Sequence, residues 1–208
     1  MRKPLLSRLS STRARAVLGL GAVLGLSVTG TFAFWTDSVT IAGQTLTSGN
    51  IDLQAGATAA TTGNTFTTTT LGTTAMVPGD SVAQVLVLKN AGNVPLKWTA
   101  KGGLLATGDA AAFDAQQALR LTITDGAPTG SAPNVTCSAG SITYVNDVAM
   151  KNVSGTDIIA TRQAAIAGGG GTKTLCISIK LAAGADQALS NGKTATSAFT
   201  FLGTSDVS

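Results

Sequence analysis

The strongest pattern in the chain is a strict alternation of apolar and polar side chains over residues 175–181. Leu175, Ile177, Ile179 and Leu181 alternate there with Cys176, Ser178 and Lys180. Successive side chains of a β-strand point to opposite faces, so the pattern predicts a strand with one buried face. The same period recurs over residues 96–101 and 119–124. Segments of this kind must bury their apolar faces against a second layer.

Turn signals separate these segments at residues 78–80, 91–93, 125–126 and 191–192, each rich in Gly, Pro, Asn or Asp. Residues 81–88, between the first two turns, are apolar on both faces, which predicts a central strand of a two-layer fold. The last turn precedes a final strand whose inward side chains should be Ala195, Ser197, Phe199 and Phe201. Trp98 is expected to pack in the core.

Other segments have weaker patterns. Residues 109–118 predict a helix capped by Asp109, and residues 157–167 fit either a second helix or an irregular strand. Residues 51–53 and 141–145 predict short strands, and residues 65–71 an exposed hairpin or edge strand. Residues 127–135 contain Pro128 and Pro133 and are expected to form a loop. Together the segments predict an all-β sandwich with one or two short helices.

The first 33 residues have the pattern of a secretory signal peptide. A basic start without acidic residues precedes the apolar run 16–28, and Thr31-Phe32-Ala33 matches a small-residue cleavage site. The apolar run is shorter than the roughly 20 residues that a membrane-spanning helix needs. We therefore expect a signal-peptide helix in residues 1–33, cleavage between Ala33 and Phe34, and a single domain over residues 34–208. An uncleaved membrane anchor is the alternative.

The net charge argues against a nucleic-acid partner. Five of the 14 basic residues lie in the leader, so the processed chain keeps nine against ten acidic residues, a net charge of −1. A basic patch for nucleic acid or anionic lipid is therefore not expected.

The chain contains no histidine, and all its acidic residues are aspartates. Histidine is the most frequent general base and metal ligand near neutral pH, so we expect neither an enzyme nor a cofactor. Asp109, Asp114 and Asp125 could contribute to a weak calcium site, although their spacing is not that of a calcium-binding loop.

Cys137 and Cys176 are the only cysteines. In an exported protein two cysteines usually form a disulfide bond, and two buried free thiols are the alternative.

Residues 34–41 follow the cleavage site directly. Phe34 and Trp35 precede an alternating segment, and Trp35, Val39 and Ile41 are expected to share one face of a strand. An exposed sheet edge is a template for such a strand, and a head-to-tail contact of this kind gives a filament. The strand could pair with a neighbouring copy or fold back into its own domain.

Four motifs resemble the TasA/camelysin family of exported bacterial proteins. They are the junction of residues 31–37 followed by 47–53, the turn 78–80 with residues 89–97, the passage 113–124, and residues 191–193 leading to 199–201. The resemblance implies a jelly-roll sandwich, processing by a SipW-type signal peptidase, and assembly of identical subunits into biofilm-matrix or cell-surface fibres. It also implies that residues 34–41 act as the exchanged strand. The chain lacks the Lys- and Glu-rich insertions of some members, and its cysteine pair is not part of the family pattern.

Two other functions remain open at this stage. A monomeric surface adhesin would use the Thr-rich residues 58–74. A camelysin-like metalloprotease would need a set of zinc ligands and a base, usually His and Glu, and the chain has neither residue type.

Overall fold

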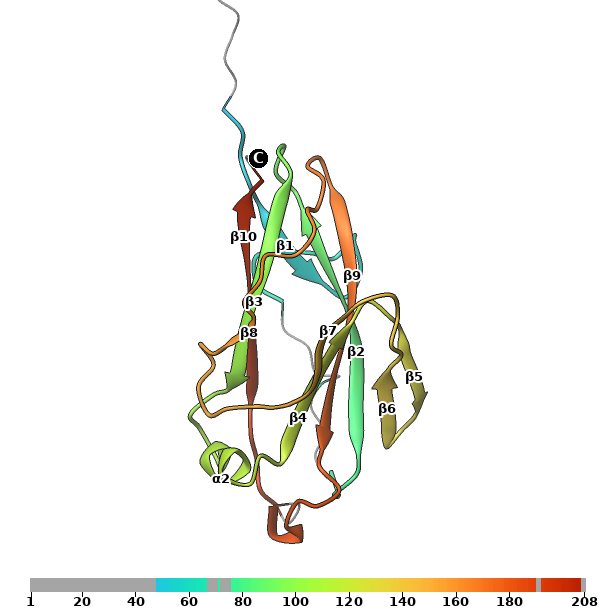
Figure 1. Ribbon diagram of the computed structural model, residues 1–208, viewed down its shortest axis with the longest axis vertical. Helices are drawn as coiled ribbons and strands as arrows, with labels where there is room; N and C mark the ends of the chain where they lie inside the picture. The colour runs from blue at the N-terminus through green and yellow to red at the C-terminus, as the bar shows by residue number, and fades with distance from the viewer. Residues whose placement is uncertain (1–47, 67–70, 72–75, 190–191, 207–208) are drawn as a thin grey trace, which may run out of the picture. The chain divides into compact units, whose positions relative to one another are not determined.

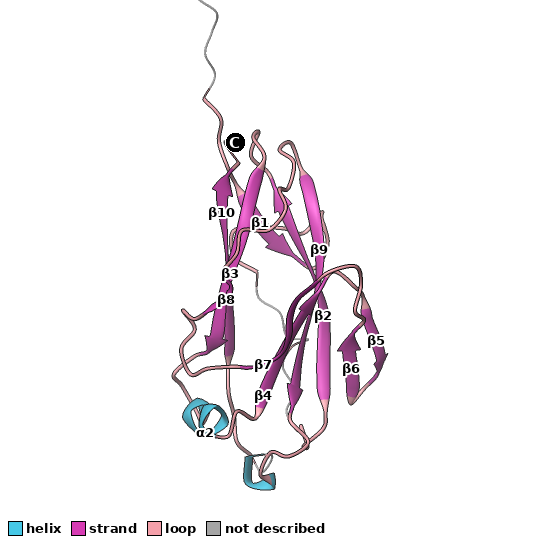
Figure 2. Ribbon diagram, in the orientation of Figure 1, coloured by secondary structure: helices cyan, strands magenta, loops and turns pink. Residues whose placement is uncertain are grey.

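The computed structural model describes residues 48–66, 71, 76–189 and 192–206. The chain divides into two units, 1–46 and 47–208, and every described residue belongs to the second. These residues form two β-sheets packed as a sandwich (Figures 1 and 2). The prediction of an all-β sandwich is therefore confirmed. The signal-peptide helix expected in residues 1–33 lies outside the described residues.

The larger sheet has the strand order β5-β6-β2-β9-β4-β7, and β1 also pairs with β2. Its strands are β1 (Leu53–Gly56), β2 (Ser81–Asn90), β4 (Leu119–Thr124), β5 (Pro128–Ser131), β6 (Asn134–Cys137), β7 (Thr143–Ala149) and β9 (Gly171–Leu181). β2 and β9 are antiparallel along ten residue pairs and form the centre of the sheet. β6 touches β2 in parallel at a single pair, Ser81 and Asn134.

The smaller sheet has the order β10-β3-β8. Its strands are β3 (Leu96–Leu104), β8 (Asp157–Ile159) and β10 (Ser197–Ser205). β10 is antiparallel to β3 along its whole length without a shift of register. Two short helices, α2 (Ala110–Ala115) and the 3-10 helix η2 (Gln187–Leu189), complete the described elements.

The core lies between the sheets. Trp98 is 1% exposed, as predicted, and its ring centroid lies 5.3 Å from that of Tyr144 and 5.9 Å from that of Phe201. The apolar residues predicted to face inward on β3, β4 and β9 are all buried: Leu96, Trp98, Ala100, Leu119, Leu121, Ile123, Leu175, Ile177, Ile179 and Leu181. Alternation therefore predicted the inner faces of these strands correctly.

The helix predicted over residues 109–118 is shorter, because α2 ends at Ala115 and Gln117 has a φ of 49°. Asp109 stands at the N-cap position but makes no side-chain capping hydrogen bond. Its carboxylate instead accepts hydrogen bonds from Lys193 Nζ (2.9 Å) and the Thr194 N–H (3.0 Å). The capping prediction was therefore wrong, since a tertiary contact uses the same oxygens.

The loop predicted at residues 127–135 was also wrong. The segment forms most of a hairpin, in which β5 pairs antiparallel with β6. Proline is compatible with the first residue of an edge strand, where its missing N–H breaks no ladder, and Pro128 occupies that position in β5. Pro128 thus begins the short edge strand β5, and Pro133 lies in the turn between β5 and β6.

Other boundaries differ by a few residues. The strand expected at residues 51–53 begins only at Leu53, and Ile51 is exposed. The strand expected at 141–145 is β7, which runs on to Ala149. Residues 157–167 follow the irregular-strand alternative, with the three residues of β8 and an isolated bridge between Ile166 and Leu96. Residues 67–70 of the predicted 65–71 hairpin lie outside the described residues.

Cys137 and Cys176 form a disulfide bond, as predicted. The bond ties β6 to β9, although β2 lies between these two strands in the sheet order. The β5–β6 hairpin is therefore held across β2 by a covalent link as well as by its single pair with Ser81.

Removal of this bond should destabilise the sandwich. We expect the double variant Cys137→Ser/Cys176→Ser to lose about 4 kcal/mol of unfolding free energy, because the bond restricts the unfolded chain over a loop of some 40 residues. Urea denaturation of the variant and the parent measures the difference. A loss below about 1 kcal/mol would contradict this account of the hairpin.

Candidate strand-binding groove

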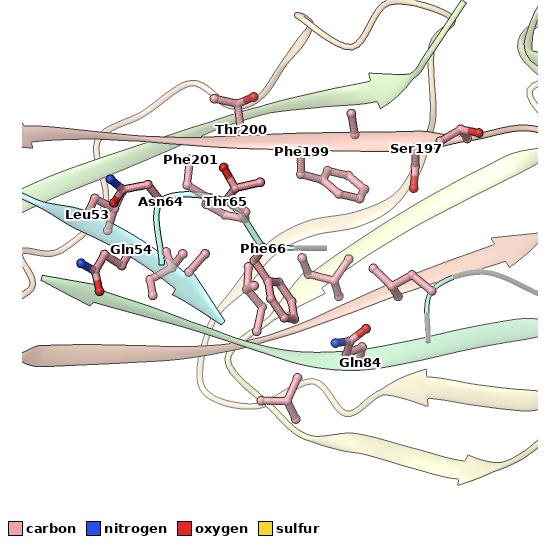
Figure 3. A pocket seen from close by; sticks show the side chains of 18 of the residues that line it. Leu53, Gln54, Asn64, Thr65, Phe66, Gln84, Ser197, Phe199, Thr200 and Phe201 are labelled. Carbon is pink, nitrogen blue, oxygen red and sulfur yellow. The ribbon is translucent and has the colours of Figure 1, made fainter. Parts of the chain in front are cut away.

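A groove of about 590 Å³ lies between β2 of the larger sheet and β10 of the smaller one. Its apolar lining includes Leu53, Phe66, Leu86, Leu88, Phe199 and Phe201. Figure 3 shows Phe199 and Phe201 projecting from β10 and Phe66 lying across from them, with Gln84 on the β2 side. The groove therefore lies between the two sheets, beside the edge strand β10.

Backbone groups of β10 face this groove. The N–H of Leu105 donates to the carbonyl of Thr196 at 2.7 Å, which makes this a hydrogen-bonded pair of the β3–β10 ladder. Such pairs alternate along an antiparallel ladder, so the backbone N–H and C=O of Ser197, Phe199 and Phe201 point away from β3. Among the residues that the structure describes, no strand pairs with β10 on that side. Within the described residues, this side of β10 is therefore an open sheet edge.

β2 has a shorter open edge on the other side of the groove. The N–H of Leu181 donates to the carbonyl of Asp80 at 2.9 Å, so even-numbered residues of β2 pair with β9. Odd-numbered residues face outward, where β1 covers the end at Val87 and β6 the start at Ser81. Ala83 and Val85 remain between them, without a strand partner in the described part of the chain.

The other edges carry features that discourage strand addition. β7 shifts register twice against β4, and its Asp147 has a φ of 49°. β8 is three residues long and starts with a charge, and β5 starts with Pro128. β10 has nine residues (SAFTFLGTS), no charge, no proline and an unbroken register. Of the edge strands β5, β7, β8 and β10, β10 is thus the one best suited to pair with a further strand.

Most of the predicted site residues lie outside the described part of the chain. These are the cleavage-site residues Ala33 and Phe34 and the strand residues Trp35, Val39 and Ile41. Their roles stay predictions. Of the predicted site residues, the structure places only the disulfide pair, Cys137 and Cys176.

The three aspartates considered for calcium are not brought together. Asp109, Asp114 and Asp125 each lie beside a different lysine, Lys193 at 2.9 Å, Lys151 at 3.5 Å and Lys173 at 3.3 Å respectively. The described residues contain no group of three or more candidate metal ligands. Within the same residues, no helix has both the length and the apolar character needed to cross a bilayer.

Asp125 connects the end of β4 to neighbouring strands. Its carboxylate accepts a hydrogen bond from the Ile142 N–H at 2.7 Å and another from Lys173 Nζ at 3.3 Å. The Ile142 N–H, and after it Lys173, hold the pKa of Asp125 below its usual value. A lowered folded pKa means that the charged carboxylate stabilises the fold above the unfolded value, and that this stability is lost as the pH falls through the folded value.

We therefore expect Asp125→Asn to weaken the fold at neutral pH and to lose part of its acid sensitivity. Unfolding free energies of parent and variant are measured at about pH 6 and about pH 2.5. Their difference should be smaller at the lower pH, because Asp in the unfolded chain is protonated below about pH 4 and the charged carboxylate of the folded state then loses its advantage. An equal difference at both pH values would contradict the proposed charge effect.

The groove itself was not anticipated from the sequence. Phe199 and Phe201 were expected to face inward and are half-buried against the core, as predicted. The sequence contained no signal that they also border an open space, because the groove depends on how distant segments meet. Thr65 was assigned to an exposed Thr-rich segment, and it lines the same groove.

Fold and groove together define a disulfide-bonded β-sandwich with an open edge strand. The chain matches no protein-family model and no curated protein sequence.

Proposed function

We propose that this protein is a secreted structural subunit that assembles into extracellular, biofilm-matrix or cell-surface fibres. Assembly would follow removal of residues 1–33, and residues 34–41 of one copy would insert into the groove of the next. The observation that carries this proposal is the uncharged, unbroken edge of β10 beside a groove lined in part by large apolar side chains.

The segment 34–41 has the pattern that the groove requires. A strand added to a sheet edge gains main-chain hydrogen bonds, and alternate side chains fill pockets beneath it. Trp35, Val39 and Ile41 lie on one face of such a strand, and each could contribute roughly 1.5–3 kcal/mol when buried. Asp37 shares that face, and the polar side chains of Asn64 and Thr65 in the groove can accommodate it.

The location of the groove supports a filament rather than a closed dimer. The described chain enters the sandwich beside the β2–β3 turn, where Asn93 bonds to Asn50, whereas the groove runs between β2 and β10. A contact between two different surfaces of the same molecule is heterologous and need not close into a ring. The resemblance to the TasA/camelysin family supports the same function, including processing by a SipW-type signal peptidase.

Electron microscopy of the purified chain from residue 34 onward tests the proposal. We expect fibres built from identical subunits, without added nucleic acid or membrane. Protein that stays monomeric by sedimentation at high concentration, in conditions where it is folded, would contradict the proposed function.

A further inference from the structure

The described chain begins in a clamp beside the turn between β2 and β3. The N–H of Asn50 donates to Asn93 Oδ1 at 2.7 Å, and the N–H of Asn93 donates to the carbonyl of Asn50 at 3.1 Å and to its Oδ1 at 3.0 Å. The N–H of Ala91 donates to the carbonyl of Asp52 at 2.8 Å. Residues 50–52 and 91–93 are thus bound to each other, and we name them the entry clamp.

The two halves of the entry clamp approach so closely that only glycine fits at residue 92. A Cβ atom added to Gly92 would lie 2.4 Å from the carbonyl oxygen of Asn50, which is too close for two non-bonded heavy atoms. Glycine is the residue that permits such close backbone approach. The clamp is therefore tightly packed as well as hydrogen-bonded.

Buried hydrogen bonds hold the β2–β3 turn that forms one half of the clamp. Asn90 is fully buried, and its Nδ2 donates to the carbonyls of Val94 (2.8 Å) and Ile166 (3.1 Å). Asn90 Oδ1 accepts from the N–H of Gly92 at 3.0 Å, and the carbonyl of Gly92 accepts from the N–H of Gly169 at 2.7 Å. A buried polar network with every partner in place is rigid. The half of the clamp that lies in the β2–β3 turn is therefore held in a fixed position.

The clamp also sets the direction of the chain. In Figure 1 the blue segment from residue 48 runs past the end of the sandwich at which β10 ends, and β1 continues from the clamp toward the interior. β1 then borders the groove through Leu53 and Gln54. The first described residues, 48 and 49, therefore lie on the outer side of the clamp, whereas the groove lies on its inner side.

We propose that the entry clamp selects insertion into a neighbouring copy over insertion into the protein's own groove; this rests on the proposed function. A strand tethered by a flexible linker competes for its own groove with a high effective concentration. An anchor at residues 50–52 with the groove on its inner side lowers that concentration, because a strand that enters the protein's own groove from residue 48 must first reverse the direction of the described chain. Asn50, Gly92 and Asn93 are positioning residues in this account.

Loosening the clamp should therefore convert fibres into self-complemented monomers. Asn93→Ala removes the Oδ1 acceptor for Asn50, and Gly92→Ala forces the two backbones apart. For chains that begin at residue 34, we expect the assembled fraction in sedimentation velocity to fall roughly tenfold, the factor expected from the loss of one or two hydrogen bonds. Asn146→Ala on exposed β7 and Gly155→Ala, where an added Cβ meets nothing within 4 Å, are the matched controls.

A second measurement separates self-insertion from simple destabilisation. Monomers of each clamp variant should melt at a higher temperature than the same variant lacking residues 34–41, because their own strand fills the groove. Equal melting temperatures, or wild-type levels of assembly in both variants, would overturn the role of the clamp. If wild-type protein forms no fibres and only the variants gain stability from residues 34–41, the fibre function fails, while the clamp's effect against self-insertion stands. Wild-type monomers that are stabilised by their own residues 34–41 would overturn the role of the clamp.

Discussion

A processed chain that lacks residues 34–41 is expected to remain a folded monomer at concentrations at which the complete processed chain assembles. The deletion removes three apolar anchors, Trp35, Val39 and Ile41, each worth roughly 1.5–3 kcal/mol when buried. It also removes the strand that would bond to the open edge of β10. Together these losses should weaken association by about three orders of magnitude or more. Multi-angle light scattering of the two chains measures the effect.

The control for the deletion is addition of a synthetic peptide with the sequence of residues 34–41. The peptide should bind the shortened chain and raise its melting temperature, because ligands that bind only the folded state stabilise it. Large particles of unchanged size after the deletion would contradict strand exchange. The sandwich would still be present, since all its described strands follow residue 52.

The second large effect is expected from a single carboxylate in the groove. Ser197 lines the groove from β10 and is partly exposed. Ser197→Asp adds one carboxylate there, and an inserted strand would remove its charge from water, which is costly without a partner. We expect assembly to weaken by roughly 100-fold, on the scale of about 3 kcal/mol for burying an unsatisfied polar group.

The same variant should change the monomer by no more than about 1 kcal/mol in urea denaturation, because position 197 stays in contact with solvent there. Ser131→Asp is the matched control, since Ser131 is exposed and lies outside the groove. Sedimentation velocity of both variants compares their assembly. Equal assembly of Ser197→Asp and the control would show that the groove is not the acceptor.

The sequence predicted those elements that have a clear local pattern of apolar and polar side chains. The alternation over residues 96–101, 119–124 and 175–181 reflects one buried face, so it located β3, β4 and β9 and their core residues. It was misleading where a local signal had two meanings. Proline is typical of loops and also of edge-strand starts, so Pro128 concealed the β5–β6 hairpin.

The groove could not be predicted in this way, because it arises from long-range strand order. Leu53, Phe66, Leu86 and Phe199 come from four separate segments that meet only when β1 joins β2 and β10 pairs with β3. The entry clamp has the same origin, since Asn50 and Asn93 are 43 residues apart. Alternation indicates which face of a strand is buried, but it does not indicate which strand becomes an edge.

The most direct test of strand exchange is a disulfide cross-link between two differently labelled populations. One population carries Val39→Cys in an isotopically heavy chain, and the other carries Ser197→Cys on β10 in a light chain. After mixing and mild oxidation, mass spectrometry should find a disulfide bond that joins position 39 of a heavy chain to position 197 of a light chain. Heavy chains with Trp35→Cys or Ile41→Cys in place of Val39→Cys test the neighbouring registers in the same way. If no link joins the two populations, while a single chain with both cysteines links only to itself, the segment belongs to its own sandwich and the proposed assembly is wrong.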